Sequence, residues 1–227
     1  MSNLIGVGLY TPTEASRLLH VPAAKISRWL RGHRVAGRNY EALWTPEVDL
    51  GDGRIYLGFR DLMEVRVADK FISYGVSPQR VRAAILLARD IVDEARPLST
   101  NRFRTDGRDI FLHVIERERH GEERENLLNL FHRQYEFKQI IDPLLKTIDF
   151  DECGAPLLWW PAGRRLKVVV DPARAFGQPI DAATSVPTAV LAAVGRQQGI
   201  RGAARAYAVP VTSVRRAIEF EDQRQAA

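Results

Sequence analysis

Basic side chains dominate the first part of the chain. Between Met1 and Tyr40, six of them accompany a single acid, Glu14. They are Arg17, Lys25, Arg28, Arg31, Arg34 and Arg38. Arginine donates paired N–H groups to phosphate oxygens and to the edge of guanine in the DNA major groove. The whole chain has a formal net charge of +5 and a pI near 9.6, which also suits a polyanionic partner.

Patterns of catalytic or metal-binding residues are not found in the sequence. The histidines stand at spacings that fit no metal site, with one another or with Cys153; they are His20, His33, His113, His120 and His132. Gly6-Val7-Gly8 lacks the third glycine and the strand-to-helix frame of a dinucleotide-binding loop. No Gly-x-Ser-x-Gly motif or Cys/His pair indicates a nucleophile. We therefore expect a protein that is not an enzyme and needs no metal or cofactor.

The composition is that of a globular protein. Of 227 residues, 45% are hydrophobic and 27% are charged, and no apolar run approaches the ~18 residues of a membrane span. The start, "MSNLIGVGLYTP", lacks the basic region and apolar core of a secretion signal. Cys153 is the single cysteine, so no internal disulfide can form. We expect a cytoplasmic protein with no membrane partner.

A helix-turn-helix is predicted where the basic residues lie. Thr11 can cap the first helix, and Glu14 stands three residues later, as in a capping box. A turn at His20-Val21 precedes a second helix from about Pro22 to Arg31, which Gly32 ends. Two short helices joined by a three-to-four-residue turn are typical of this motif.

The second of these helices has one basic face. At 100° per residue, the inward side holds Ile26, Trp29 and Leu30. The outward side holds Ala24, Arg28 and Arg31, with Lys25 and Ser27 on its flanks. This face combines small residues, a hydroxyl and three cations with no acid, which fits contact with DNA. A solvated basic helix is the alternative interpretation.

Further elements are predicted from turn and capping signals. Gly51-Asp52-Gly53 indicates a hairpin between strands over 42–48 and 54–59, a two-stranded wing. Helices are predicted over Asp61–Tyr74 and from the cap Ser77 to about Ala95. Beyond Pro97 we expect, in order, a hairpin around Asp106-Gly107, a charged loop over 116–126, a helix and then a strand over 135–150, a hairpin turning at Pro161-Ala162-Gly163, and helices over about 187–198, 201–207 and 211–223.

The predicted fold class is α+β and mainly α-helical. It comprises a winged helix-turn-helix over 1–96, a small α+β middle segment with β-hairpins over 97–172, and a three-helix helix-turn-helix unit over 173–227.

The helix-turn-helix pattern occurs twice. "ASRLLHVPAAKISRWL" (15–30) and "AARAYAVPVTSVRRAI" (203–218) align without a gap. In the second copy, Val214, Ala217 and Ile218 point inward, and Thr212, Arg216 and Glu219 point outward. Glu219 takes the place of Arg31, and a carboxylate there would repel phosphates. We therefore predict a face for either DNA or a partner protein; its candidate residues are Arg201, Arg205, Thr212, Ser213, Arg215, Arg216 and Phe220.

The order helix-turn-helix, wing, helix, "YGVSPQRVRAAI" resembles the MerR-type DNA-binding domain over roughly residues 9–95. The resemblance implies that Lys25, Ser27, Arg28 and Arg31 lie on the recognition helix. It also implies that Tyr40 and Arg54 bind the DNA backbone from the wing. Arg17 and Arg38 complete the set of candidate DNA-binding residues. The chain lacks the long dimerising helix of MerR regulators, because the predicted helix from Pro78 is too short for a coiled coil.

The remainder resembles a second family. "VVVDPARAFGQPIDAATSVPTAVLAAVGRQQGIRGAARAYAVPVTSVRRAIEFE" is similar to the small helical domain of the DUF-type antitoxins. With the MerR-like front half, the whole chain resembles the large VapB-type antitoxins of type II toxin–antitoxin operons. The resemblance implies binding to a VapC toxin, a magnesium-dependent PIN-domain ribonuclease, and repression of the operon through promoter DNA. A homodimer is expected on the operator, since one helix-turn-helix makes few contacts.

Two alternatives remain open at this point. The first is a stand-alone MerR-like regulator whose segment 98–170 holds a small-molecule effector in a pocket lined by Phe111, Trp159 and Trp160. The second is an assembly protein that binds no DNA and uses both helical units for protein contacts.

Overall fold

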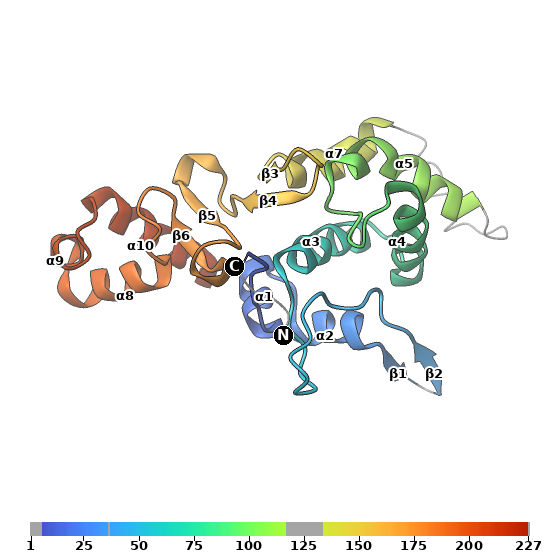
Figure 1. The fold of residues 1–227 in the computed structure, drawn as a ribbon, viewed down its shortest axis with the longest axis horizontal. Helices are drawn as coiled ribbons and strands as arrows, with labels where there is room; N and C mark the ends of the chain where they lie inside the picture. Colours follow the sequence, from blue (N-terminus) through green and yellow to red (C-terminus); the bar gives the residue numbers. More distant parts are fainter. Residues whose placement is uncertain (1–5, 36, 117–133, 227) are drawn as a thin grey trace. The chain divides into compact units, whose positions relative to one another are not determined.

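The computed structural model describes residues 6–35, 37–116 and 134–226, which form two compact units (Figure 1). The first unit, called the N-terminal unit below, comprises Thr11–Lys146 and Phe150–Pro156. The second, the C-terminal unit, comprises Met1–Tyr10, Thr147–Asp149 and Leu157–Ala227. The fold is α+β, as predicted. The charged loop expected over 116–126 lies, beyond its first residue, outside the described residues.

The N-terminal unit begins with two short helices and a turn at the predicted places. Helix α1 spans Pro12–Leu19 and α2 spans Ala23–Arg31. The Thr11 hydroxyl accepts a hydrogen bond from the Glu14 amide, and the Glu14 carboxylate accepts one from the Thr11 amide at 2.8 Å, which completes the capping box. His20 ends α1 in the left-handed region, with φ at 57°. The inward side of α2 is buried as predicted, and Gly32 ends that helix.

The wing differs from the prediction. The two-stranded ribbon lies earlier, with β1 (His33–Val35) antiparallel to β2 (Arg38–Tyr40). The strands predicted over 42–48 and 54–59 are wrong, since this region contains one isolated bridge, Val48 to Tyr56.

Aspartate side chains explain the missing ladder. The carboxylate of Asp49 accepts from the Gly51 amide, and that of Asp52 from the Arg54 amide. Side chains that bond nearby backbone donors in this way compete with strand pairing.

Two helices follow as predicted. Helix α3 spans Phe59–Ser73 and is buried along most of its length. Helix α4 spans Pro78–Val92, and the Ser77 hydroxyl accepts from the Arg80 amide at its start.

The hairpin expected around Asp106-Gly107 is wrong, because this segment lies inside helix α5, Asn101–Glu116. The Thr100 hydroxyl accepts from the Phe103 amide and caps the helix. A Cβ atom at Gly107 would lie 2.7 Å from the Phe103 ring. The glycine thus permits the ring to pack against its own helix, a role that sequence reasoning mistook for a turn.

Four phenylalanines form the centre of the N-terminal unit. The rings of Phe71, Phe103, Phe111 and Phe137 form five contacting pairs with centroids 4.5 to 6.3 Å apart, and Phe137 comes from α7 (Gln134–Leu145). Edge-on and tilted rings at these separations attract one another beyond the effect of burial. Phe111 is fully buried in this cluster.

A buried polar network joins three segments of this unit. Asp61 accepts hydrogen bonds from the Trp44 indole, the Glu47 and Gly58 amides and the Arg96 guanidinium. One turn along α3, Glu64 accepts from the Leu98 and Ser99 amides, both at 3.1 Å. Burial raises the pKa of Glu64 to about 7, although these two amides lower it.

The C-terminal unit contains a sheet and three helices. The sheet order is β3-β4-β5-β6, with strands Ile148–Phe150, Pro156–Trp159, Val168–Val170 and Pro179–Asp181. The hairpin predicted at Pro161-Ala162-Gly163 is confirmed, with a short 3-10 helix, η1 (Arg164–Leu166), before β5. A second 3-10 turn, η2 (Ala175–Gly177), precedes β6.

The three predicted C-terminal helices are confirmed. They are α8 (Thr188–Gln198), α9 (Ile200–Ala206) and α10 (Val211–Ala226), shown in orange to red in Figure 1. Leu191, Ala203, Val214 and Ala217 form their shared core. A Cβ atom at Gly195 would lie 2.9 Å from the Val214 side chain, so this glycine lets α8 and α10 pack closely.

The expected middle segment, 97–172, contributes to both units. Its helices α5 and α7 belong to the N-terminal unit, and most of its strand residues belong to the C-terminal unit. The division into three folding domains remains a prediction. No helix in the described part of the chain combines the length and apolar character needed to cross a membrane.

Glu64 should make stability depend on pH. Its folded-state pKa lies above its ordinary value, so it contributes stability that is complete below about pH 4.5 and lost as the pH rises through about 7. Urea unfolding between pH 4.5 and 7.5 should show a loss of roughly 3 kcal/mol from this group, and Glu64→Gln should abolish that part. Glu152→Gln, on the surface, is the control. Equal pH slopes in wild type and Glu64→Gln would contradict the assignment.

Phe220→Ala should destabilise the C-terminal unit. Its ring is 5% exposed in the packed interior face of α10, and truncating a buried phenylalanine costs about 3–5 kcal/mol. Thermal unfolding measures the loss. Tyr207→Ala, on the surface of the same unit, should change stability by less than about 0.5 kcal/mol. A Phe220 variant as stable as this control would show that the ring is not part of the core.

Candidate nucleic-acid interface

The outer face of α2 has the arrangement expected from its sequence. Ala24, Arg28 and Arg31 are exposed, while Lys25 and Ser27 are half-buried at the sides. No described residue forms an ion pair or hydrogen bond with the Arg28 guanidinium. This face therefore offers a free cation and room for close approach, as a helix in the major groove requires.

The other cations of α2 have partners within the unit. Lys25 forms an ion pair with Asp69 of α3 at 2.8 Å and lies 4.9 Å from the centre of the Trp29 ring. The Arg31 guanidinium donates to the backbone carbonyl of Gly53, which ties the end of α2 to the Gly51–Gly53 loop. Both interactions orient the helix, and Arg28 remains the cation with the greatest freedom to bind a ligand.

The residues assigned to the wing lie in different places. Tyr40 stacks on His33, with ring centroids 4.9 Å apart and planes 11° from parallel. Arg54 belongs to the loop after Gly53, and its side chain is 79% exposed. Arg17 is exposed on α1. Arg38 lies in β2, and its side chain is outside the part of the chain that the structure describes.

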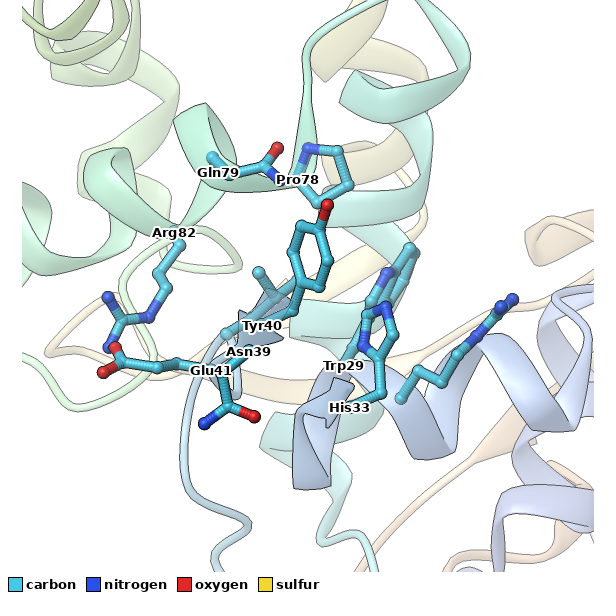
Figure 2. A pocket seen from close by; sticks show the side chains of 10 residues that line it. Trp29, His33, Asn39, Tyr40, Glu41, Pro78, Gln79 and Arg82 are labelled. Carbon is cyan, nitrogen blue, oxygen red and sulfur yellow. The ribbon is translucent and has the colours of Figure 1, made fainter. Parts of the chain in front are cut away.

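A pocket of 510 Å³ lies between α2, the β1–β2 ribbon and the start of α4 (Figure 2). Its lining residues are Arg28, Trp29, His33, Asn39, Tyr40, Glu41, Leu43, Pro78, Gln79 and Arg82. It brings together Arg28 and Tyr40, two residues predicted from the sequence, but not Arg17 or Arg54.

Sequence reasoning missed the polar groups of this pocket. Arg82 forms an ion pair with Glu41 and donates to the Ala42 carbonyl, so its position is fixed. The Nδ1 atom of His33 is buried and has no partner among the described residues. The side chains of Asn39 and Gln79 add amide groups (Figure 2). They were missed because the ribbon was predicted over 42–59, whereas it lies over His33–Tyr40.

The second helix-turn-helix repeats the backbone of the first. Its turn residue Ala208 has φ at 52°, and the matching His20 has φ at 57°. The next residue is buried in both copies, Val209 in one and Val21 in the other. The sequence repeat therefore reflects one local fold.

The faces of the two copies differ. Arg216, which aligns with Arg28, donates to the fully buried Asp181 of β6 at 2.6 and 3.1 Å. Ser213, which aligns with Lys25, is 0% exposed. Burial raises the pKa of Asp181, but hydrogen bonds from Arg216, Thr184 and Ser213 outweigh burial and hold that pKa below its ordinary value. On α10 the position that aligns with Arg28 is therefore paired with a buried acid of the sheet, whereas Thr212 and Glu219, which align with Ala24 and Arg31, are exposed.

The candidate residues of the second copy are thus divided. Ser213, Arg216 and Phe220 lie against the interior of the unit. Four others are exposed: Arg201, Arg205, Thr212 and Arg215. Among the residues that the structure describes, no group of three or more His, Cys, Asp or Glu side chains could hold a metal ion.

Comparisons with known proteins identify relatives that match most of the chain. It is 30% identical over 185 residues to "Putative antitoxin VapB45" of Mycobacterium tuberculosis, which covers 77% of this chain and 77% of that protein. Its fold is similar to the crystal structure of Rv2018 from Mycobacterium tuberculosis, with a TM-score of 0.69 and 24% identity over 95% of this chain and 100% of that one. No model of a protein family matches. On the similarity to its curated relative, the chain belongs to the VapB-type antitoxins.

Proposed function

We propose that this chain neutralises a VapC-type PIN-domain ribonuclease toxin and represses its own operon by binding promoter DNA as a homodimer. The relationship to "Putative antitoxin VapB45" supports the antitoxin role. The single observation that supports DNA binding is the face of α2, where Ala24, Arg28 and Arg31 are exposed and no acid lies between them.

In this proposal α2 acts as the recognition helix of a MerR-like winged helix-turn-helix. Arg28 reaches base edges or phosphates, and the ion pair of Lys25 with Asp69 holds the helix at a fixed angle to α3. Tyr40 and Arg54 contact the DNA backbone beside it. Two copies are needed because specific protein–DNA complexes bury about 1,000–2,500 Å² of protein surface, more than one short helix supplies.

A second candidate function is a stand-alone MerR-like regulator with a small-molecule effector. The pocket beside Arg28 favours it, because a ligand there would touch a residue of the DNA-binding face. This pocket lies at α2 and not in the segment 98–170, where the sequence suggested an effector site.

Arg28→Ala should weaken operator binding. An arginine that contacts a guanine or a phosphate contributes about 1–3 kcal/mol, so the Kd for promoter DNA should rise about 5- to 150-fold. Fluorescence anisotropy with a labelled promoter fragment measures it. Arg165→Ala, an exposed arginine of η1 without a partner among the described residues, is the matched control. Equal Kd values for both variants would show that Arg28 of α2 does not contact the DNA.

Binding to a toxin is tested by co-expressing this chain with the neighbouring reading frame of the same operon. Size-exclusion chromatography with mass detection should show one complex of both proteins, and Arg28→Ala should leave this complex intact because α2 faces DNA. A dimer of the antitoxin eluting without the neighbour would exclude toxin binding. In that case the regulator with an effector is the better description.

A further inference from the structure

Three arginines of the C-terminal unit are exposed on one surface and have no acidic partner. Arg201 and Arg205 belong to α9, and Arg215 belongs to the first turns of α10. No described residue forms an ion pair or a hydrogen bond with any of the three. They lie together along one groove.

The groove runs between the end of α8, helix α9 and the start of α10. It has a volume of 630 Å³, and its other lining residues are Gly195, Gln198, Gly199, Ile200, Gly202 and Val211. None of the lining residues is acidic. Arg201 and Arg205 are one helical turn apart, so their side chains project from the same side of α9.

The remaining arginines of this unit are mostly neutralised by acids. Arg164 pairs with Asp149, Arg174 with Asp171, Arg196 with Asp222, Arg216 with Asp181 and Arg224 with Glu221. Acids are therefore frequent in the unit, yet they are absent from the groove. Three like charges held close together repel one another unless an anion binds between them.

We propose that this groove binds the phosphodiester backbone of nucleic acid, at a site separate from α2. The planar guanidinium group donates two parallel N–H groups to a phosphate, and three such groups along a groove fit a chain of phosphates. We assign it to the backbone and not to base edges, because on α10 Arg216 is paired with Asp181 and the exposed Glu219 would repel phosphates. The inference does not depend on the toxin.

The edge of the groove limits how the ligand lies. A neighbouring hollow shares Ile200 and Arg215 with it but also contains Glu219 and Asp222. Phosphates would be repelled there. The nucleic-acid backbone therefore passes over Arg201 and Arg205 and leaves at Arg215. An acidic protein surface is the competing occupant.

The salt dependence of binding tests the proposal on the full chain. The probe is a 30-base-pair duplex of arbitrary sequence, which reports phosphate contacts independently of the operator. The triple variant R201Q/R205Q/R215Q should lower the slope of log Kd against log salt by about 2–3, since each phosphate contact contributes about 0.9. R201K/R205K/R215K retains the charges and should retain most of the slope, and Arg165→Gln should leave it unchanged.

Two results would overturn the proposal. One is an unchanged slope in the glutamine triple variant whose circular dichroism matches wild type. The other is loss of binding to the neighbouring toxin with DNA binding intact, which would identify the groove as a protein-docking site. An Arg28→Ala variant measured in parallel separates the two DNA sites. If that variant binds the promoter normally and the triple variant has a lower slope of log Kd against log salt, α2 is excluded as a DNA-binding site and DNA binding by the groove is supported.

Discussion

The carboxylate of Asp61 organises the N-terminal unit. It is fully buried and accepts hydrogen bonds from four donors: the Trp44 indole, the Glu47 and Gly58 amides and the Arg96 guanidinium. These donors belong to the loop after the ribbon, the start of α3 and the segment before α5. Burying a carboxyl group is costly unless its oxygens accept hydrogen bonds, and these four donors supply them. The loop that follows the β1–β2 ribbon is thereby fixed to the start of α3 and to the segment before α5.

Local chemistry made much of this fold predictable. The capping box at Thr11 and Glu14, the serine cap at Ser77 and the buried stripe of α2 all depend on residues close in sequence. The predictions of secondary structure were wrong where contacts with other parts of the chain, or side-chain hydrogen bonds to the backbone, determine the local conformation. Asp106-Gly107 has the composition of a turn, but Gly107 lies under the Phe103 ring. That ring belongs to a cluster that also contains rings from α3 and α7. The paired strands expected around Gly51–Gly53 do not form, because aspartate side chains there accept hydrogen bonds from backbone amides.

The candidate site was predictable to a similar degree. The exposure of Ala24, Arg28 and Arg31 follows from helical periodicity alone. The pocket beside them does not, because Gln79 and Arg82 come from α4 and meet Tyr40 only in the folded unit. In the second copy, periodicity placed Arg216 outward. Arg216 instead pairs with Asp181 of the sheet. That sheet is formed by residues upstream of the repeat, so helical periodicity could not predict the contact.

The ion pair between Arg216 and Asp181 also has a consequence for how such repeats diverge. Arg216 aligns with Arg28, a candidate DNA-binding residue, yet it forms an ion pair with the buried carboxylate of Asp181. Counting positive residues on the second helix would rank both copies as basic, although the charge of Arg216, unlike that of Arg28, is paired with a buried acid. Duplicated helix-turn-helix units are better compared by the acid that each arginine meets than by the arginines they share.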